Sequence, residues 1–303
     1  MPVCFGFLFH KKKRDDKMQQ IQWFPGHMSK TRRMIQNNIK YIDVVVEILD
    51  ARIPLSGRTP NFDDILRNKP RIIILNKYDL ADKSVTDLWI KDYAKKGIKV
   101  IPVSCATGYG INKIAPAARE LMRERIEKEK AKGISRPVKI MMVGIPNVGK
   151  STLINKLVGK SKTEVGNRPG VTKTQQWVRI KDGLELLDTP GLLPPKFEDQ
   201  ELAKNLAYTG AIKDEIINIE LLSYSLLEYL RDNYNEILCA RYKLTEDISE
   251  MKGYEILEYI GKKRGFMISG GEIDTERAAN TVMDEFRACK IGNITLEKPT
   301  EKE

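Results

Sequence analysis

The feature of the sequence that most constrains its fold is one glycine-rich octapeptide. Residues 144–151 read Gly-Ile-Pro-Asn-Val-Gly-Lys-Ser, which fits the pattern G-x-x-x-x-G-K-[ST]. An apolar run, Ile140–Val143, precedes it, and a helical pattern, Thr152–Leu157, follows it. This order predicts a phosphate-binding loop, because the glycines let backbone N–H groups surround phosphate oxygens at a helix N-terminus. We expect Lys150 to neutralise the β- and γ-phosphates and the Ser151 hydroxyl to bind Mg²⁺.

Before this loop, short apolar runs alternate with helical patterns. Continuous apolar runs are typical of strands buried on both faces of a parallel sheet, and the helices between them predict its cover. The expected strands are Val44–Leu49, Ile72–Leu75, Val100–Val103 and Ile140–Val143, and the expected helices are Phe62–Arg67, Thr86–Lys95 and Asn112–Lys132. The pattern therefore predicts an α/β fold with a parallel sheet of the P-loop type.

The pattern changes at Pro194-Pro195, and we expect a domain boundary there. Before it, an Asp182-Gly183 pair predicts a hairpin between two apolar segments. After it, residues 198–290 are mostly helical in pattern. We expect an α/β domain over residues 18–195 and an all-α domain over 196–303. Residues 1–17 fit neither a secretory signal nor a transit peptide. We therefore expect natural translation to start at Met18, with 1–17 a non-native or disordered leader.

Three further segments follow expected strands and carry chemistry. Asp188-Thr189-Pro190-Gly191 places an acid where it can hold the second shell of Mg²⁺ and a glycine N–H where it can sense a γ-phosphate. Asn76-Lys77-Tyr78-Asp79 ends in a carboxylate that can accept hydrogen bonds from N1–H and the 2-amino group of guanine. Adenine lacks this donor pattern, so Asp79 would select guanine. Ser104-Cys105-Ala106 would support the base from its other side.

These segments resemble the G1, G3, G4 and G5 boxes of GTPases. Pro169-Gly170-Val171-Thr172 then fits the G2 switch, with Thr172 as the second hydroxyl on Mg²⁺. Their order along the chain is G4, G5, G1, G2, G3, a circular permutation that leaves the strand neighbours in place. The chain therefore resembles the circularly permuted GTPases of ribosome assembly. The segments that extend this resemblance are Gln22–Met28 (QWFPGHM), Leu49–Pro54 (LDARIP), Arg264–Phe266 and Thr275–Ala278.

The resemblance implies an activity and a set of partners. It implies a GTP hydrolase, stimulated by the ribosome, that acts in late assembly of the large (50S) subunit. Such a protein binds pre-50S particles in its GTP state and leaves after hydrolysis. Its ligands would be GTP or GDP and Mg²⁺, with K⁺ as a further candidate. The expected nucleotide-binding residues are Asn76, Lys77, Asp79, Ser104, Cys105, Ala106, Asn147, Val148, Gly149, Lys150, Ser151, Thr152, Asp188 and Gly191.

The expected catalytic residues are His27, Lys150, Thr172 and Gly191, and the expected Mg²⁺ ligands are Ser151, Thr172 and, through water, Asp188. Leu192 stands where signalling GTPases carry a water-orienting glutamine, and the resemblance assigns that role to His27. A loop or capping histidine is the alternative. The resemblance also implies that Asn147 helps to hold K⁺, against a purely turn-stabilising asparagine. Arg52 is expected to pack or to steady a loop near the sheet end.

Charge divides the chain into two unlike parts. The net charge is +11, but residues 1–195 carry +18 and residues 196–303 carry −7. The basic part is the one expected to meet polyanions. Two clusters are candidates for rRNA contact: Lys30, Arg32 and Arg33, and Lys262, Lys263 and Arg264. The alternative for both clusters is a solvated helix face.

Other classes of protein are disfavoured by what the sequence lacks. Its four isolated cysteines and two histidines suit neither a zinc cluster nor a disulfide framework, so we expect a cytoplasmic protein. No apolar run approaches the ~20 residues that span a bilayer. We expect a monomer without membrane contact. Two other functions stay open: a GTP-dependent RNA-binding scaffold with incidental hydrolysis, and a signalling switch that acts on a protein effector.

Overall fold

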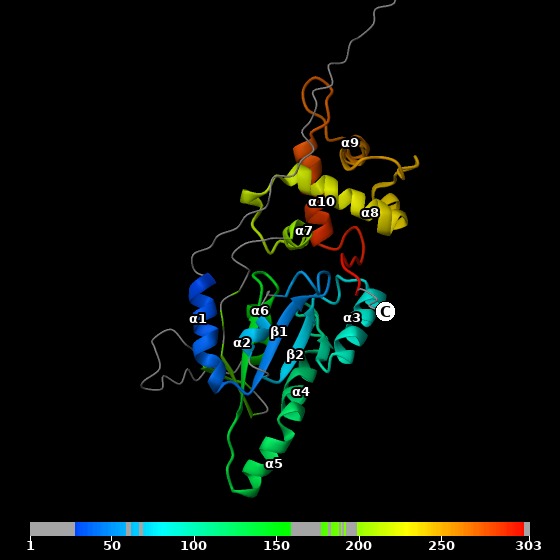
Figure 1. Cartoon of the computed structure of the whole chain (residues 1–303). Coiled ribbons are helices and arrows are strands. Elements are labelled where there is room, and N and C mark those ends of the chain that lie inside the picture. The colour runs from blue at the N-terminus through cyan, green and yellow to red at the C-terminus, as the bar shows by residue number, and fades with distance from the viewer. Residues whose placement is uncertain are drawn as a thin grey trace, which may run out of the picture.

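The computed structural model describes residues 28–58, 62–66, 69–158, 177–180, 183–187, 189, 191 and 199–299. These residues form an α/β part and an all-α part that lies at one end of its sheet (Figure 1). Among them, no helix is both long enough and apolar enough to cross a membrane.

The α/β part is built on a six-stranded sheet in the order β3-β2-β1-β4-β6-β5. All neighbouring strands run parallel except the edge pair β5 and β6, which is antiparallel. The strands are β1 (Val44–Asp50), β2 (Arg71–Asn76), β3 (Lys99–Pro102), β4 (Val138–Gly144), β5 (Trp177–Ile180) and β6 (Leu184–Leu187). Every residue of β1 is buried, as expected for an inner strand covered on both faces.

Helices cover the sheet and connect its strands. On one face, Trp89 and Tyr93 of α3 pack against Leu49, Ile73 and Leu75. The larger apolar cluster includes the opposite face of β2 and residues of α1, α4 and α6. The helices of this part are α1 (Met28–Asn38), α2 (Phe62–Leu66), α3 (Lys83–Lys95), α4 (Ile114–Leu121), α5 (Arg123–Ala131) and α6 (Lys150–Val158), with 3₁₀ turns at Ile39–Tyr41 and Ile111–Lys113.

The all-α part packs four helices around one apolar interior. They are α7 (Gln200–Tyr208), α8 (Ile219–Tyr242), α9 (Gly253–Arg264) and α10 (Thr275–Arg287), with a 3₁₀ turn at Asp214–Ile216. The longest, α8, is kinked at Tyr234, where φ is −143° and ψ is 39°. The apolar cluster that contains Ile140 of the sheet also contains Leu226 and Phe286 of these helices. The core is thus continuous between the two parts.

The expected strands and fold class are confirmed, and three expected helices have other bounds. α6 runs from Lys150 to Val158, beyond the expected Thr152–Leu157 at both ends. α3 begins at Lys83 rather than Thr86, because the Asp82 carboxylate caps its first turn. The stretch expected as one helix over residues 112–132 is a 3₁₀ turn followed by α4 and α5, which are separated at Met122. α5 has no fully buried residue; its tertiary contacts include partly buried Ile126 against the core and the ion pair of Arg125 with Asp43.

Candidate nucleotide site

The sequence motifs meet at one edge of the sheet because their strands are parallel. Asp50, the last residue of β1, lies opposite Asn76, the last residue of β2. Gly144, the last residue of β4, lies opposite Ile48 on the other side of β1. The glycine-rich loop, the Asn76–Asp79 motif and the Ser104–Ala106 segment all follow these carboxyl ends. In open α/β sheets, ligands bind at this edge.

Asn76 joins two of these segments to each other. Its Nδ2 donates to the Val148 carbonyl in the glycine-rich loop at 2.6 Å, and its Oδ1 accepts from the Cys105 N–H at 3.0 Å. Asn76 is almost fully buried, so both bonds are shielded from water. Gly149 is required beside it, because its φ is +95° and a Cβ there would lie 2.3 Å from Asn76 Nδ2.

The glycine-rich loop leads directly into α6. Lys150 is the first residue of that helix, and Ser151 and Thr152 are exposed in its first turn. Gly191 lies against the same loop: a Cβ at Gly191 would stand 2.9 Å from the Pro146 nitrogen. Thr189 Oγ1 donates to the Met142 carbonyl of β4 at 2.5 Å. Thr189 and Gly191 therefore lie beside β4 and the loop that follows it.

Asn147 connects the loop to the all-α part. Its φ is +58°, a left-handed conformation that asparagine tolerates better than most residues. Its Nδ2 donates to the carbonyl of Gly210, just after α7, at 2.8 Å. Neither sequence interpretation of Asn147 included this contact. The bond uses the amide nitrogen of Asn147, whereas a K⁺ ion would be held by the amide oxygen.

The Asp79 carboxylate is available to a ligand. The side chain is half-buried, and no donor among the described residues is hydrogen-bonded to its oxygens. The ring of Tyr78 stacks on that of Tyr109, with centroids 5.5 Å apart. In the segment after β3, Ser104 Oγ accepts from the Thr107 N–H at 3.1 Å, and this bond closes the turn of residues 104–107.

The two remaining members of that segment are also fixed. Lys156 Nζ, on α6, donates to the Ala106 carbonyl at 3.1 Å. Burial raises the pKa of the Cys105 thiol to about 11, although the charge of Lys156 opposes this shift. Cys105 is therefore a neutral thiol at physiological pH, and its backbone N–H makes the contact to Asn76.

A buried ion cluster lies next to the motif, and sequence reasoning did not identify its centre. The Asp50 carboxylate is paired with Arg52 through two bonds of 3.0 and 2.9 Å and lies 3.0 Å from Lys77 Nζ. Burial disfavours the charged carboxylate, but the charges of Arg52 and Lys77 outweigh this and hold the pKa of Asp50 below its usual range. Its position opposite Asn76, at the strand end, was the available signal.

Arg52 extends this cluster to the all-α part, in agreement with the packing role expected of it. Its Nη1 donates to the Arg287 carbonyl at the end of α10 at 3.4 Å, and its guanidinium lies 5.5 Å from the centroid of the Phe286 ring. Lys77, with φ of +59°, is thus linked through Asp50 and Arg52 to α10.

Several expected site residues lie outside the described residues: His27, Thr172 and Asp188, and the side chain of Lys30. Arg32 and Arg33 are exposed on α1, whose buried face carries Thr31, Ile35 and Asn38. The structure divides the second basic cluster. Lys262 and Lys263 are exposed, whereas Arg264 is paired with Glu285 at 3.3 Å and stacks on Tyr242.

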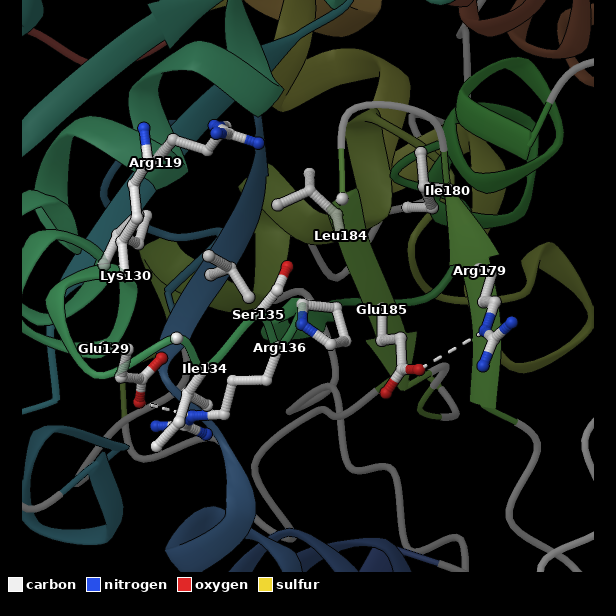
Figure 2. A pocket seen from close by; sticks show the side chains of 15 residues that line it. Arg119, Glu129, Lys130, Ile134, Ser135, Arg136, Arg179, Ile180, Leu184 and Glu185 are labelled. Atoms are coloured by element: carbon white, nitrogen blue, oxygen red, sulfur yellow. Dashed lines mark hydrogen bonds and ion pairs between the residues drawn. The ribbon is translucent and has the colours of Figure 1, made fainter.

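A groove lies at the edge of the sheet opposite the nucleotide motifs, at the amino ends of β4 and β6. This groove of about 940 Å³ is lined by the α5–β4 connection and by the turn before β6. Figure 2 shows that two of its cations are already paired with acids across or beside it: Arg136 with Glu129 and Arg179 with Glu185. It shares no residue with the nucleotide motifs.

The motif geometry at the carboxyl edge defines a circularly permuted P-loop GTPase. The model of the family described as 50S ribosome-binding GTPase matches residues 139–252. Ribosome biogenesis GTPase A from Bacillus licheniformis is 49% identical over 92% of this chain and 98% of its own length. The protein of that name from Thermotoga maritima is 32% identical over 92% and 95%.

A mitochondrial relative and a solved structure agree with this class. Mitochondrial ribosome-associated GTPase 1 from Mus musculus is 38% identical over 91% of this chain and 90% of its own length. The crystal structure of GNP-bound YlqF from T. maritima superposes with a TM-score of 0.61 at 29% identity, over 89% of this chain and 98% of that one. The chain belongs to the ribosome biogenesis GTPase A family, and it is a GTP hydrolase.

Proposed function

We propose that this GTPase acts in late assembly of the large ribosomal subunit, binding a precursor particle with GTP and leaving it after hydrolysis. The direct bond from Asn147 in the glycine-rich loop to Gly210 of the all-α part carries the proposal. A domain that touches the phosphate-binding loop can respond to which nucleotide is bound there. The names of the relatives and the basic first part of the chain support a ribosomal partner.

The proposed nucleotide contacts follow from the motif positions. Asp79 would accept hydrogen bonds from guanine, and Lys150 would neutralise the phosphates. Mg²⁺ suits the donor set of hydroxyl and carboxylate oxygens that Ser151, Thr172 and Asp188 provide, and it would stabilise developing charge on the phosphates. The amide oxygen of Asn147 is a candidate ligand for K⁺.

The proposed roles in hydrolysis fall on Gly191 and His27. Gly191, which packs against Pro146, would sense that phosphate through its N–H. His27 would orient the attacking water, since an imidazole that is neutral at physiological pH can accept a hydrogen bond from it. This role would depend on the ribosomal particle to position the segment that contains His27.

The proposed particle contacts divide between RNA and protein. Exposed Arg32 and Arg33, with Lys30 on the same helix, suit phosphate contact from the basic part. In the all-α part, the exposed pair Lys262 and Lys263 suits the same role. Arg264 is a structural cation there, because it is paired with Glu285. The overall charge of −7 in residues 196–303 favours ribosomal-protein contact elsewhere on that part.

The test is sedimentation with precursors of the large subunit, combined with GTP turnover. Wild-type protein should pellet with the particle in a non-hydrolysable GTP analogue and much less in GDP, and the particle should raise turnover at least tenfold. Lys150→Ala should abolish the difference between nucleotides. Replacing Lys262 and Lys263 with glutamate should weaken pelleting, whereas Lys128→Ala on exposed α5 should not. Nucleotide-independent pelleting with unstimulated turnover would favour the RNA-binding scaffold instead.

A further inference from the structure

The chain returns to the sheet after α10, in a segment that the sequence patterns gave no reason to single out. We call residues Cys289–Glu297 the C-terminal strap. Its central residues are buried, with Ile294 1% exposed, Thr295 0% and Leu296 6%. The strap lies between α8 of the all-α part and the loop that follows β2.

One side of the strap is bonded to the base-recognition loop, residues Asn76–Asp82. Asn293 Nδ2 donates to the backbone carbonyl of Asp79 at 2.7 Å. The Ile294 N–H donates to the Leu80 carbonyl at 3.4 Å. The strap therefore holds the backbone of the residue whose carboxylate is proposed to recognise guanine.

Thr295 holds the end of the same loop. Its Oγ1 accepts from the Asp82 N–H at 3.0 Å. The Asp82 carboxylate in turn caps α3 by accepting from Ser84 N and Val85 N at 2.9 and 3.3 Å. The hydroxyl of Thr295 thus fixes the point where the base-recognition loop becomes a helix.

The other side of Thr295 belongs to the all-α part. Its carbonyl accepts from Tyr229 Oη at 3.2 Å and from Tyr234 Oη at 3.0 Å, and its N–H lies 3.2 Å from Tyr234 Oη. Tyr234 is the residue at which α8 is kinked. The kinked part of α8 and the two tyrosines together form the surface that the strap contacts.

The end of the strap is anchored separately. The Glu297 carboxylate accepts from the N–H groups of Leu55 and Ser56 at 2.6 and 2.9 Å, and from Asn205 Nδ2 on α7 at 3.0 Å. Trp89 Nε1 on α3 donates to the Glu297 carbonyl at 2.9 Å. Because the strap is anchored at Glu297 and bonded to α8 at Thr295, it can restrain the loop rather than follow its motion.

We infer that the C-terminal strap positions the base-recognition loop, so that the all-α part helps to determine both guanine selectivity and the residence time of the nucleotide. The inference rests on the proposed role of Asp79. Two carboxylate oxygens must face two donors of guanine, and this requires a fixed backbone at Asp79. The loop needs outside support, because Lys77 holds a left-handed backbone with φ of +59°. Asn293 and Thr295 are the positioning residues.

The test compares the affinities for GDP and IDP in matched variants of the full chain. The base of IDP lacks the 2-amino group, so a misplaced Asp79 loses two bonds to GDP but only one to IDP. Thr295→Val removes the hydroxyl while keeping the shape, and Thr295→Ser restores it. Asn293→Ala changes an exposed side chain and should leave folding intact. Loss of one such hydrogen bond should weaken GDP binding by about fivefold and lower the GDP-to-IDP preference.

Control variants distinguish a failure of this inference from a failure of the proposed role of Asp79. Lys298→Ala, exposed and adjacent to the strap, should match wild type, and Thr295→Ser should recover most of the preference. If Asp79→Asn leaves the preference unchanged, the assignment of Asp79 is wrong. If Asp79→Asn lowers it but Asn293→Ala and Thr295→Val do not, the strap is no positioning element. Equal weakening of GDP and IDP would also overturn the inference, because a general loss of folding has that effect.

Discussion

At the scale of single residues, the arrangement of the site is held by buried side chains that connect the motifs to one another. Asn76 bridges the glycine-rich loop and the Ser104–Ala106 segment with two buried bonds. Asp50 bridges Lys77 and Arg52. Both residues end neighbouring parallel strands, so the sheet register itself places these two connecting groups side by side.

The ion cluster at Asp50 predicts a specific dependence of stability on pH. The folded state holds the pKa of Asp50 below its unfolded value of about 3.8, so the carboxylate stabilises the fold above that pH. This stabilisation declines as the pH falls below about 4, because Asp50 then binds a proton in the unfolded chain but stays ionised in the folded chain. Between pH 5 and pH 3, the wild type should lose about 1 kcal/mol more unfolding free energy than Asp50→Asn.

Urea unfolding at each pH measures this difference. The comparison of slopes cancels the titration of all other carboxylates, and Asp87→Asn on the exposed face of α3 serves as a matched control. Parallel stability curves for the wild type and Asp50→Asn would show that Asp50 is not held ionised in the folded state.

At the scale of elements, the sequence predicted what local patterns encode. Apolar runs located β1 to β4, and the motifs at their ends located the site, because each signal lies within a few residues of its consequence. The C-terminal strap escaped prediction, since Asn293 contacts a residue 214 positions away and its segment has no periodicity. The start of α3 was misplaced because the cap at Asp82 was not recognised.

That cap predicts two separable effects of similar substitutions. Asp82 and Asp199 each cap a helix, α3 and α7 respectively, because each carboxylate accepts from the backbone N–H groups two and three residues further along the chain. Asp82→Ala and Asp199→Ala should each cost about 1 kcal/mol of unfolding free energy. Only Asp82→Ala should weaken GDP binding as well, by severalfold, because α3 begins where the base-recognition loop ends.

Chemical denaturation and a fluorescent GDP titration on both variants give the two readouts. Asp199→Ala is the matched control for loss of a cap without loss of the loop's support. Equal GDP affinity in the two variants would contradict this prediction, because it would show that the cap of α3 does not support nucleotide binding.

At the scale of the whole molecule, the all-α part is attached to the GTPase part at two different places. On the base side, the C-terminal strap and Arg52 bind it to the loop after β2 and to the end of β1. On the phosphate side, Asn147 of the glycine-rich loop donates to the Gly210 carbonyl, and the chain enters the all-α part after Gly191 through Pro194-Pro195, a connection outside the described residues. We expect the base-side contacts to persist in both nucleotide states, whereas the Asp188–Gly191 segment is the one expected to respond to the γ-phosphate.

We expect the base side to act as a fixed attachment and the phosphate side as a nucleotide-sensitive one, so that the all-α part turns about the C-terminal strap. We therefore expect a rotation between the GTP and GDP states rather than a detachment, with affinity for the particle set by the angle.

A flexible Gly/Ser spacer inserted after Pro195 should leave GDP affinity unchanged, because the strap is intact, but should abolish the preference of the particle for the GTP state. Sedimentation of the spacer variant with the GTP analogue and with GDP measures that preference. A spacer of equal length within the exposed α5–β4 connection, after Gly133, is the control and should retain it. If the variant with the spacer after Pro195 also retains the full preference, force does not pass through the Pro194-Pro195 connection, and the contact of Asn147 with Gly210 becomes the remaining direct route from the phosphates to the all-α part.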